Sequence, residues 1–134
     1  MDSTENIIVP IYTTATELLE EVQKLLSDNS SWAKGAFARD KDNNLRWGIE
    51  PDATKWSVAG AVYKVYLNSV SRGIVHTHAC LYLEAAALKV GFHSLGEACA
   101  NGSIAKQKEI LKLAIEFSKR NFLTWQAWAT RTVH

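Results

Sequence analysis

The segment from residue 30 to residue 56 constrains the fold of this chain more than any other. It reads SSWAKGAFARDKDNNLRWGIEPDATKW, with three tryptophans and a central run of Asp and Asn residues at 40–44. Because Asp and Asn tolerate left-handed turn positions, this run predicts a β-hairpin with strands at 35–39 and 45–49. An isolated two-stranded hairpin is marginally stable in water, so it must dock on the rest of the chain. The side chains expected to fasten it are Trp32, Phe37 and Trp47.

A helix is predicted before this hairpin. Thr14 and Glu17 have the spacing of a capping box, in which each side chain hydrogen-bonds the other residue's backbone N–H. The apolar residues that follow recur with a period of 3.6; they are Leu18, Leu19, Val22, Leu25 and Leu26. Residues 1–12 are expected to form an extended N-terminal segment that leads into this helix.

A second helix is predicted after the hairpin. Pro51-Asp52 suits a helix start, because proline fits the first helical position and an acid favours the positive end of the helix dipole. Trp56 and Gly60 would then share one helical face. Glycine inside a helix costs about 1 kcal/mol relative to alanine. Gly60 therefore predicts that another backbone or an aromatic ring packs closely there.

Three more helices are expected in the second half of the chain. Residues 75–90 are apolar nearly all round, with Gly91 as a C-terminal cap, which predicts a central helix. Ser94 and Glu97 form a second capping-box pattern, and Ser103 caps a long final helix. Asn101-Gly102 is expected to end the helix that begins at Ser94 after about two turns.

The expected fold class is therefore mainly α, a single compact domain over residues 1–134. It has four to five helices and one small β-hairpin between the first and second helices. A chain of 134 residues is the size of one ordinary domain. Residues 123–134, which hold Trp125 and Trp128, are interpreted as a C-terminal tail that covers its own core or that of a second copy. A homodimer is compatible with this tail.

The charge balance and hydropathy narrow the class of partner. Fifteen basic and fourteen acidic residues leave a net charge of +1, so the chain lacks the strong positive field of most nucleic-acid binders. There is no signal-like start and no run of 18 apolar residues, which predicts a cytoplasmic protein without a membrane partner. Cys80 and Cys99 are interpreted as buried thiols rather than as a disulfide.

The densest set of potential metal ligands lies around the third predicted helix. In a helix, His76, Cys80 and Glu84 would share one face. The paired C-x-x-C or H-E-x-x-H patterns of zinc sites are absent from the sequence, so capping, packing or surface roles are favoured and no cofactor is expected. The weak metal candidates are His76, His78, Cys80 and His93.

Catalysis by a nucleophile is the first alternative function. Ser57, Cys80 and Cys99 are the candidate nucleophiles, with one of the nearby histidines as base. No G-x-S-x-G elbow surrounds them. A metal-dependent or cysteine/serine hydrolase would use the region that holds His76, His78, Cys80 and His93.

Nucleic-acid binding is the second alternative. Arg39, Lys41 and Arg46 alternate with aromatic residues on the hairpin, and the last helix is rich in lysine. Strand alternation favours the ordinary arrangement, in which the aromatic side chains point inward and the basic side chains point to solvent. Binding of a nucleic acid through the hairpin and the last helix is therefore not the favoured function.

Two motifs resemble a known family. Trp32-x-x-Gly35-Ala36-Phe37-Ala38-Arg39-Asp40 and Trp56-x-x-x-Gly60-Ala61 are similar to the W-x-x-G-A-x-A-R-D and W-C-x-x-G-A motifs of small domains of unknown function from actinobacteria and their phages. Ser57 stands where many members carry cysteine. The resemblance implies a compact, mainly helical domain in which the two motifs meet, and it implies no activity.

The function favoured by the sequence is a small non-enzymatic binding or protein-interaction domain, related to phages or mobile elements. Five tryptophans exceed what a core of this size requires. Arg39 or Asp40 is expected to be held by the first turn of the second helix or by a tryptophan. The partner would be a protein or a small ligand. The candidate binding residues are Trp32, Arg39, Asp40, Trp47 and Trp56.

Overall fold

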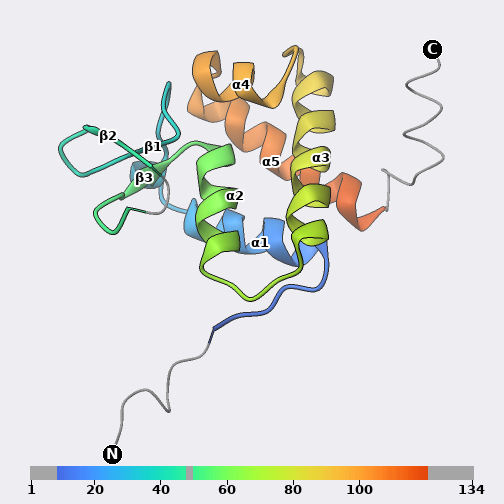
Figure 1. Ribbon diagram of the computed structural model, residues 1–134. Coiled ribbons are helices and arrows are strands. Elements are labelled where there is room, and N and C mark those ends of the chain that lie inside the picture. Colours follow the sequence, from blue (N-terminus) through green and yellow to red (C-terminus); the bar gives the residue numbers. More distant parts are fainter. Residues whose placement is uncertain (1–8, 48–49, 121–134) are drawn as a thin grey trace, which may run out of the picture.

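The computed structural model describes residues 9–47 and 50–120, and these form a helical bundle with a small sheet at one side (Figure 1). The helices are α1 (Ala15–Leu25), α2 (Val58–Leu67), α3 (Gly73–Val90), α4 (Leu95–Asn101) and α5 (Ile104–Lys119), with a 3-10 turn, η2 (Asn29–Ser31), after α1. The strands are β1 (Ala38–Arg39), β2 (Leu45–Arg46) and β3 (Lys55–Trp56). The predicted mainly α fold, with β structure between its first two α-helices, is confirmed.

Local capping explains most helix boundaries. At α1, the Thr14 hydroxyl accepts the backbone N–H of Glu17 at 3.2 Å, and the Glu17 carboxylate accepts that of Thr14 at 3.1 Å. Ser103 caps α5 as predicted, whereas at α4 the Ser94 hydroxyl accepts the Glu97 N–H but the Glu97 carboxylate pairs with His93 instead of completing a capping box. Gly91 ends α3 with a φ of 116°, a left-handed conformation that favours glycine.

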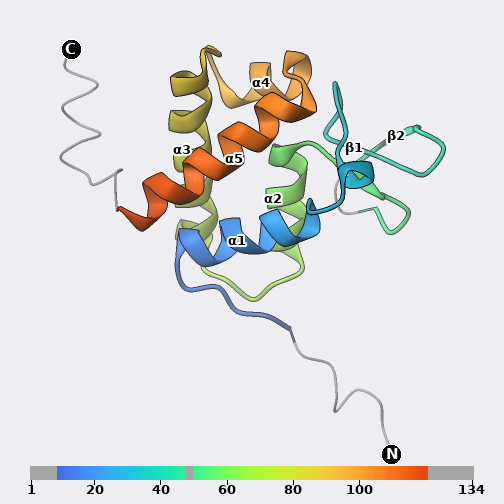
Figure 2. The ribbon, with the colours of Figure 1, turned by 180° about the vertical axis from the view of Figure 1, so that it is seen from behind.

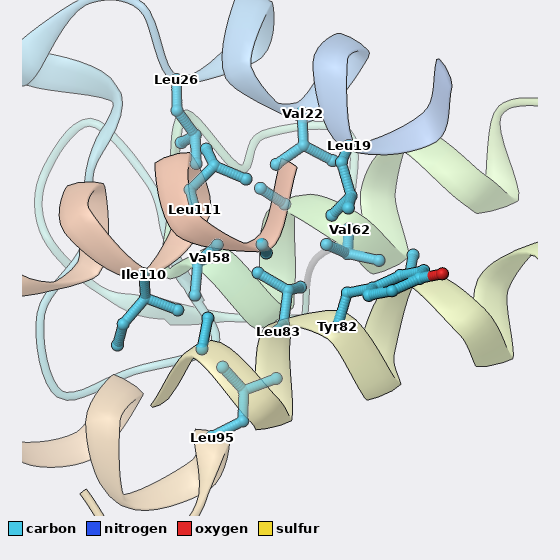
Figure 3. Packing of buried hydrophobic residues seen from close by; sticks show 14 of the residues in the cluster. Leu19, Val22, Leu26, Val58, Val62, Tyr82, Leu83, Leu95, Ile110 and Leu111 are labelled. Carbon is cyan, nitrogen blue, oxygen red and sulfur yellow. The ribbon is translucent and has the colours of Figure 1, made fainter. Parts of the chain in front are cut away.

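The apolar core lies where α3 meets α5 and α1. Figures 1 and 2 show α5 crossing beside α3, with α1 beneath both. Leu18, Leu83 and Ile110, one from each of these helices, are completely buried (Figure 3 shows part of this cluster). The prediction that the third helix is central is therefore confirmed. Among the described helices, none combines the length and the apolar character needed to cross a membrane.

The predicted hairpin forms, and a third strand joins it. The sheet is antiparallel with the order β2-β1-β3, so Ala38 of β1 lies between Arg46 and Trp56. Trp32 forms an isolated parallel bridge with Trp56 on the β3 side. Two further predicted strand residues, Gly48 and Ile49, lie outside the described residues.

The predicted start of the second helix at Pro51-Asp52 is wrong, because α2 begins seven residues later than Pro51, at Val58. Pro51 and Asp52 instead occupy a turn closed by a hydrogen bond from the Ala53 N–H to the Glu50 carbonyl at 3.0 Å. Proline and aspartate suit a turn as well as a helix start. Trp56 consequently belongs to β3 and not to the face of α2.

The N-terminal segment is anchored to the α2–α3 loop. The Val70 N–H donates to the Pro10 carbonyl at 2.9 Å, and the Tyr12 N–H donates to the Ser71 hydroxyl at 2.9 Å. These bonds hold residues 10–12 beside α1. The predicted tail at 123–134 lies outside the described residues.

Candidate functional site

The hairpin docks on the helices where Phe37 meets the N-terminus of α2. The Phe37 carbonyl accepts the Ser57 N–H at 3.1 Å and lies 3.4 Å from the Ser57 hydroxyl, which also accepts the Gly60 N–H. A Cβ placed on Gly60 would lie 1.9 Å from the Phe37 carbonyl oxygen. The prediction of a close backbone contact at Gly60 is confirmed, with Phe37 as the partner.

A buried glutamine of α5 holds the two chain segments that flank the sheet, at Ala33 and at Val58. Gln107 of α5 has no exposed surface. Its Oε1 accepts the Val58 N–H at 2.9 Å, and its Nε2 donates to the Ala33 carbonyl at 3.4 Å. Sequence reasoning missed Gln107. The sequence does carry a signal for it, because Gln107 is a polar residue on the apolar face of an amphipathic helix, one turn before Ile110 and Leu111.

Trp32 and Trp56 belong to this structural frame. Their exposed fractions are 5% and 6%, and the Trp32 indole N–H donates to the Leu26 carbonyl at 2.8 Å. Two of the five candidate binding residues are therefore core residues that join η2 and β3 to the helices. Neither is accessible to a partner in this arrangement.

Asp40 and Arg46 fix the shape of the hairpin. The Asp40 carboxylate is almost buried and accepts the backbone N–H groups of Asp42 and Asn44, both at 2.9 Å. The Arg46 guanidinium lies 3.1 Å from this carboxylate and 3.0 Å from that of Asp52. Hydrogen bonds from Asn44, then that from Asp42, and finally the Arg46 charge hold the pKa of Asp40 below its ordinary value.

Arg39 and Asp40 are held within the hairpin and the segment before it, and not by the first turn of α2 or by a tryptophan as expected. Asp40 is held within its own hairpin and not by the first turn of α2, which begins well beyond it. Arg39 donates to the Asn43 carbonyl at 2.9 Å and to the Lys34 carbonyl at 3.5 Å. Both side chains thus shape the turn, and neither is free in solvent.

Trp47 and Leu45 point outward, with exposed fractions of 70% and 66%. The expected arrangement, with hairpin aromatics inward and basic side chains outward, is therefore wrong for Trp47. Its side chain instead contacts the edge of Phe37, with ring centroids 6.5 Å apart and planes at 64°. An open groove of about 380 Å³ results, which we call the Trp47 groove; its lining residues are Phe37, Leu45, Arg46, Trp47 and Glu50.

A series of aromatic contacts connects Phe37, which lines the groove, to α2 and α3. Phe37 contacts Tyr63 of α2 at 5.7 Å between centroids, and Tyr63 contacts His76 of α3 at 6.4 Å. His76 in turn stacks on Tyr66 at 4.6 Å. The wall of the groove is therefore continuous with the helical bundle.

The outer edge of β2 is covered by its own side chains. The Leu45 carbonyl accepts a hydrogen bond from Arg46 Nη1 at 2.8 Å, and the Trp47 N–H donates to the Glu50 carboxylate at 2.8 Å. Backbone groups that are already paired do not template an added strand. A partner at this edge would meet side chains rather than strand hydrogen bonds.

The charges around the Trp47 groove are mostly acidic. Arg46 is surrounded by the carboxylates of Asp40, Asp52 and, at 4.0 Å, Glu50. Phosphate binding needs basic side chains that are not already neutralised. Of the three basic hairpin residues considered for nucleic-acid binding, Arg46 is therefore already paired with carboxylates, whereas Arg39 donates to carbonyls.

The weak metal candidates are spread over the surface of α3 and its neighbours. His76 Nε2 lies 3.6 Å from Cys80 Sγ, but His78 lies in a surface pocket with Tyr82 and Ser118, and His93 pairs with Glu97 at 3.0 Å. Glu84 is engaged elsewhere, since it accepts the Leu95 N–H at 3.1 Å. Within residues 9–47 and 50–120, no group of three or more His, Cys, Asp or Glu side chains is placed to hold a metal ion.

The candidate nucleophiles have environments that keep them neutral. Burial raises the pKa of the Cys80 thiol, with a further contribution from Glu84, and burial lowers the pKa of His76. Burial also raises the pKa of Cys99, although that thiol lies beside Ser57 at the start of α2. An activated cysteine needs the opposite shift. Ser57 itself is buried and serves as the N-cap of α2.

Comparison with known proteins identifies no relative. No family model matches the chain, and no curated protein or solved structure matches it either. The geometry of the Trp47 groove is therefore the basis on which a function is inferred.

Proposed function

We propose that this chain is a small non-enzymatic protein-interaction domain that binds its partner in the Trp47 groove. The observation that carries this proposal is the outward position of Trp47 and Leu45, 70% and 66% exposed, on a hairpin that lies beside the buried Trp32 and Trp56. Tryptophan is among the residues most enriched at binding hot spots. Large apolar side chains that lie together in solvent indicate an interaction site, because a partner that covers them removes their apolar surface from water.

The shape of the groove favours a side chain of another protein. Its volume of about 380 Å³ lies at the lower end of the range for small-molecule sites, and it is an open trough rather than an enclosed cavity. One large apolar side chain fits between Leu45 and Trp47. The carboxylates of Glu50 and Asp52 at the rim favour a basic residue next to that apolar anchor.

The groove is preorganised by the contacts beneath it. Phe37 is fixed by its carbonyl at α2, and Arg46 is fixed by two carboxylates at 3.0 and 3.1 Å. A binding surface that is ordered before association loses less conformational entropy when the partner arrives. This rigidity supports a recognition role for a hairpin that would be marginal in isolation.

We also propose that the chain belongs with the small actinobacterial and phage domains that its motifs resemble. The support is spatial: Trp32 of the first motif bridges Trp56 of the second, and Phe37 contacts Gly60. A role in a phage or mobile element is proposed from this resemblance, and a cytoplasmic location is proposed from the hydropathy of the sequence.

Selection from a random peptide library displayed on phage tests the proposed binding role. We expect enriched peptides with a large apolar residue next to Lys or Arg, and micromolar dissociation constants by calorimetry. Trp47→Ala should weaken binding at least about tenfold, the scale of a hot-spot residue worth more than 1.4 kcal/mol. Val70→Ala is the matched control, because Val70 is 63% exposed and lies on the α2–α3 loop.

Two outcomes would overturn the proposal. Absence of any enriched peptide would remove the groove as a recognition surface. Equal affinity of a selected peptide for wild type and Trp47→Ala would place the binding elsewhere.

A further inference from the structure

A second groove lies along the outer face of α1. Its volume is about 640 Å³, and its walls are α1 and the N-terminal segment that the α2–α3 loop holds in place. The lining residues are Ile11, Tyr12, Glu17, Glu20, Glu21, Gln23, Lys24 and Ser27. We call this the α1 groove.

The α1 groove combines an apolar floor with negative charge. Ile11 is 65% exposed, and Tyr12 beside it is half-buried. Of the three lining carboxylates, that of Glu21 pairs with Lys24 at 3.0 Å and that of Glu20 pairs with Lys119 at 3.5 Å, which leaves the carboxylate of Glu17 as the excess negative charge among these groups. A segment that fills this groove should therefore be apolar and carry positive charge or none.

The described part of the chain ends at the rim of this groove. The Lys119 ammonium lies 3.5 Å from the carboxylate of Glu20, and the Thr16 hydroxyl donates to that of Ser118 at 2.7 Å. The end of α5 thus lies beside α1. Fourteen residues, 121–134, follow. Fully extended they reach about 46 Å, whereas α1, with 11 residues, is about 16 Å long.

The composition of residues 121–134 matches the α1 groove. The segment NFLTWQAWATRTVH contains one arginine and no acidic side chain. Its large apolar residues are Phe122, Leu123, Trp125, Trp128 and Val133. The other terminal segment outside the described residues, 1–8, carries Asp2 and Glu5 and no Lys or Arg, so the carboxylates of the groove would repel it.

We propose that residues 121–134 bind in the α1 groove of their own chain, with Trp125 or Trp128 on Ile11 and Tyr12 and with Arg131 near the α1 carboxylates. The segment thereby covers the exposed face of α1. This proposal does not depend on the function of the Trp47 groove, which lies on the hairpin.

Fluorine NMR of the full chain, labelled with 5-fluorotryptophan, tests this proposal. The variants Trp125→Phe and Trp128→Phe assign the two relevant resonances. In the native protein we expect at least one of them to lie away from its position in urea. Trp32 and Trp56, which are buried, report whether the fold is intact, and Trp47 reports on the hairpin.

A charge-matched pair of variants then locates the binding. Glu20→Gln with Glu21→Gln should shift the Trp125 or Trp128 resonance toward its unfolded position, as should Ile11→Ser. Glu109→Gln with Glu116→Gln is the control, because it changes the net charge equally at exposed positions of α5 that do not line the groove. The control should leave both resonances in place.

Three results would overturn the proposal. The first is that Trp125 and Trp128 both resonate at their unfolded positions in the native protein. The second is that they are shifted but unaffected by the changes at Ile11, Glu20 and Glu21. The third is a dependence of their positions on protein concentration, which would assign the groove to the tail of a second copy.

Discussion

The carbonyl oxygen of Phe37 occupies the space in which a side chain on residue 60 would begin. A Cβ on Gly60 would lie 1.9 Å from that oxygen, far inside van der Waals contact. Because the same oxygen accepts the Ser57 N–H, the hairpin backbone and the start of α2 are held together at this point. The position of Trp47 depends on this contact through Phe37.

Gly60→Ala should therefore destabilise the protein. We expect the free energy of unfolding to fall by about 1–3 kcal/mol, as for overpacked sites, although alanine gains about 1 kcal/mol in helix propensity. Urea unfolding followed by circular dichroism measures this change. The same substitution should weaken peptide binding, because displacement of Phe37 moves one wall of the Trp47 groove.

Gly96→Ala is the matched control for this prediction. Its Cβ would meet only the Ser94 hydroxyl, at an ordinary 3.7 Å. We expect it to be neutral or to stabilise by up to about 1 kcal/mol. If Gly60→Ala and Gly96→Ala changed the free energy of unfolding equally, the contact between Gly60 and Phe37 would not be close.

Gln107→Met tests the buried hydrogen bonds between α5 and the hairpin segment. Methionine keeps the length of the side chain but leaves the Val58 N–H and the Ala33 carbonyl without their partner. We expect a loss of about 2–4 kcal/mol, since each buried polar group left unpaired costs about 1–3 kcal/mol. Lys112→Met, at an exposed position of α5, should change stability by less than about 0.5 kcal/mol.

Asp40→Asn should lower stability in a pH-dependent way. The folded-state pKa of Asp40 lies below the unfolded value of about 3.9, so its carboxylate stabilises the fold above that pH. This contribution is lost as the pH falls through the folded pKa. The difference in urea midpoint between wild type and variant should be largest near pH 7 and should shrink toward pH 3.

Asp42→Asn provides the comparison for Asp40. Its carboxylate is exposed in the same turn, and the substitution leaves the backbone N–H that Asp40 accepts. The variant should follow the wild-type pH profile. A difference between Asp40→Asn and wild type that stays constant from pH 7 to pH 3 would contradict the proposed role of the ionised carboxylate.

The two thiols should react slowly in the folded protein. Burial raises the pKa of Cys80 and of Cys99, which lowers the thiolate fraction at neutral pH and restricts access. We expect alkylation by iodoacetamide at pH 7.5 to be roughly tenfold or more slower than in urea. Cys80→Ser and Cys99→Ser assign the two rates. A thiol that reacts faster in the folded state would revive the hydrolase alternative.

Most helix ends can be predicted from the sequence because they depend on local chemistry. Thr14 and Ser103 cap the backbone that follows them, and Gly91 takes the left-handed conformation that ends α3. Such signals act within four residues, so tertiary structure does not alter them. At Pro51 the local signal fits both a turn and a helix, and the pairing of β3 with β1 determines the outcome.

The candidate site was less predictable because it depends on long-range contacts. Strand alternation suggested that Trp47 points inward, but Trp32 and Trp56 already occupy the core beneath the sheet. Gln107 lies 49 residues from Val58 in the chain, so no local pattern joins them. Gly60 was informative because a costly helical glycine indicates a close contact wherever the partner lies in the sequence.

The most direct test of the binding role is to map a selected peptide on the protein by amide chemical-shift changes in NMR. We predict the largest changes at Phe37, Leu45, Trp47 and Glu50, smaller changes along Tyr63 and His76, and none at Val70. Loss of these changes in Trp47→Ala, with the rest of the spectrum preserved, would complete the result. Changes centred on α4 or α5 instead, with the hairpin unaffected, would contradict a partner site in the Trp47 groove.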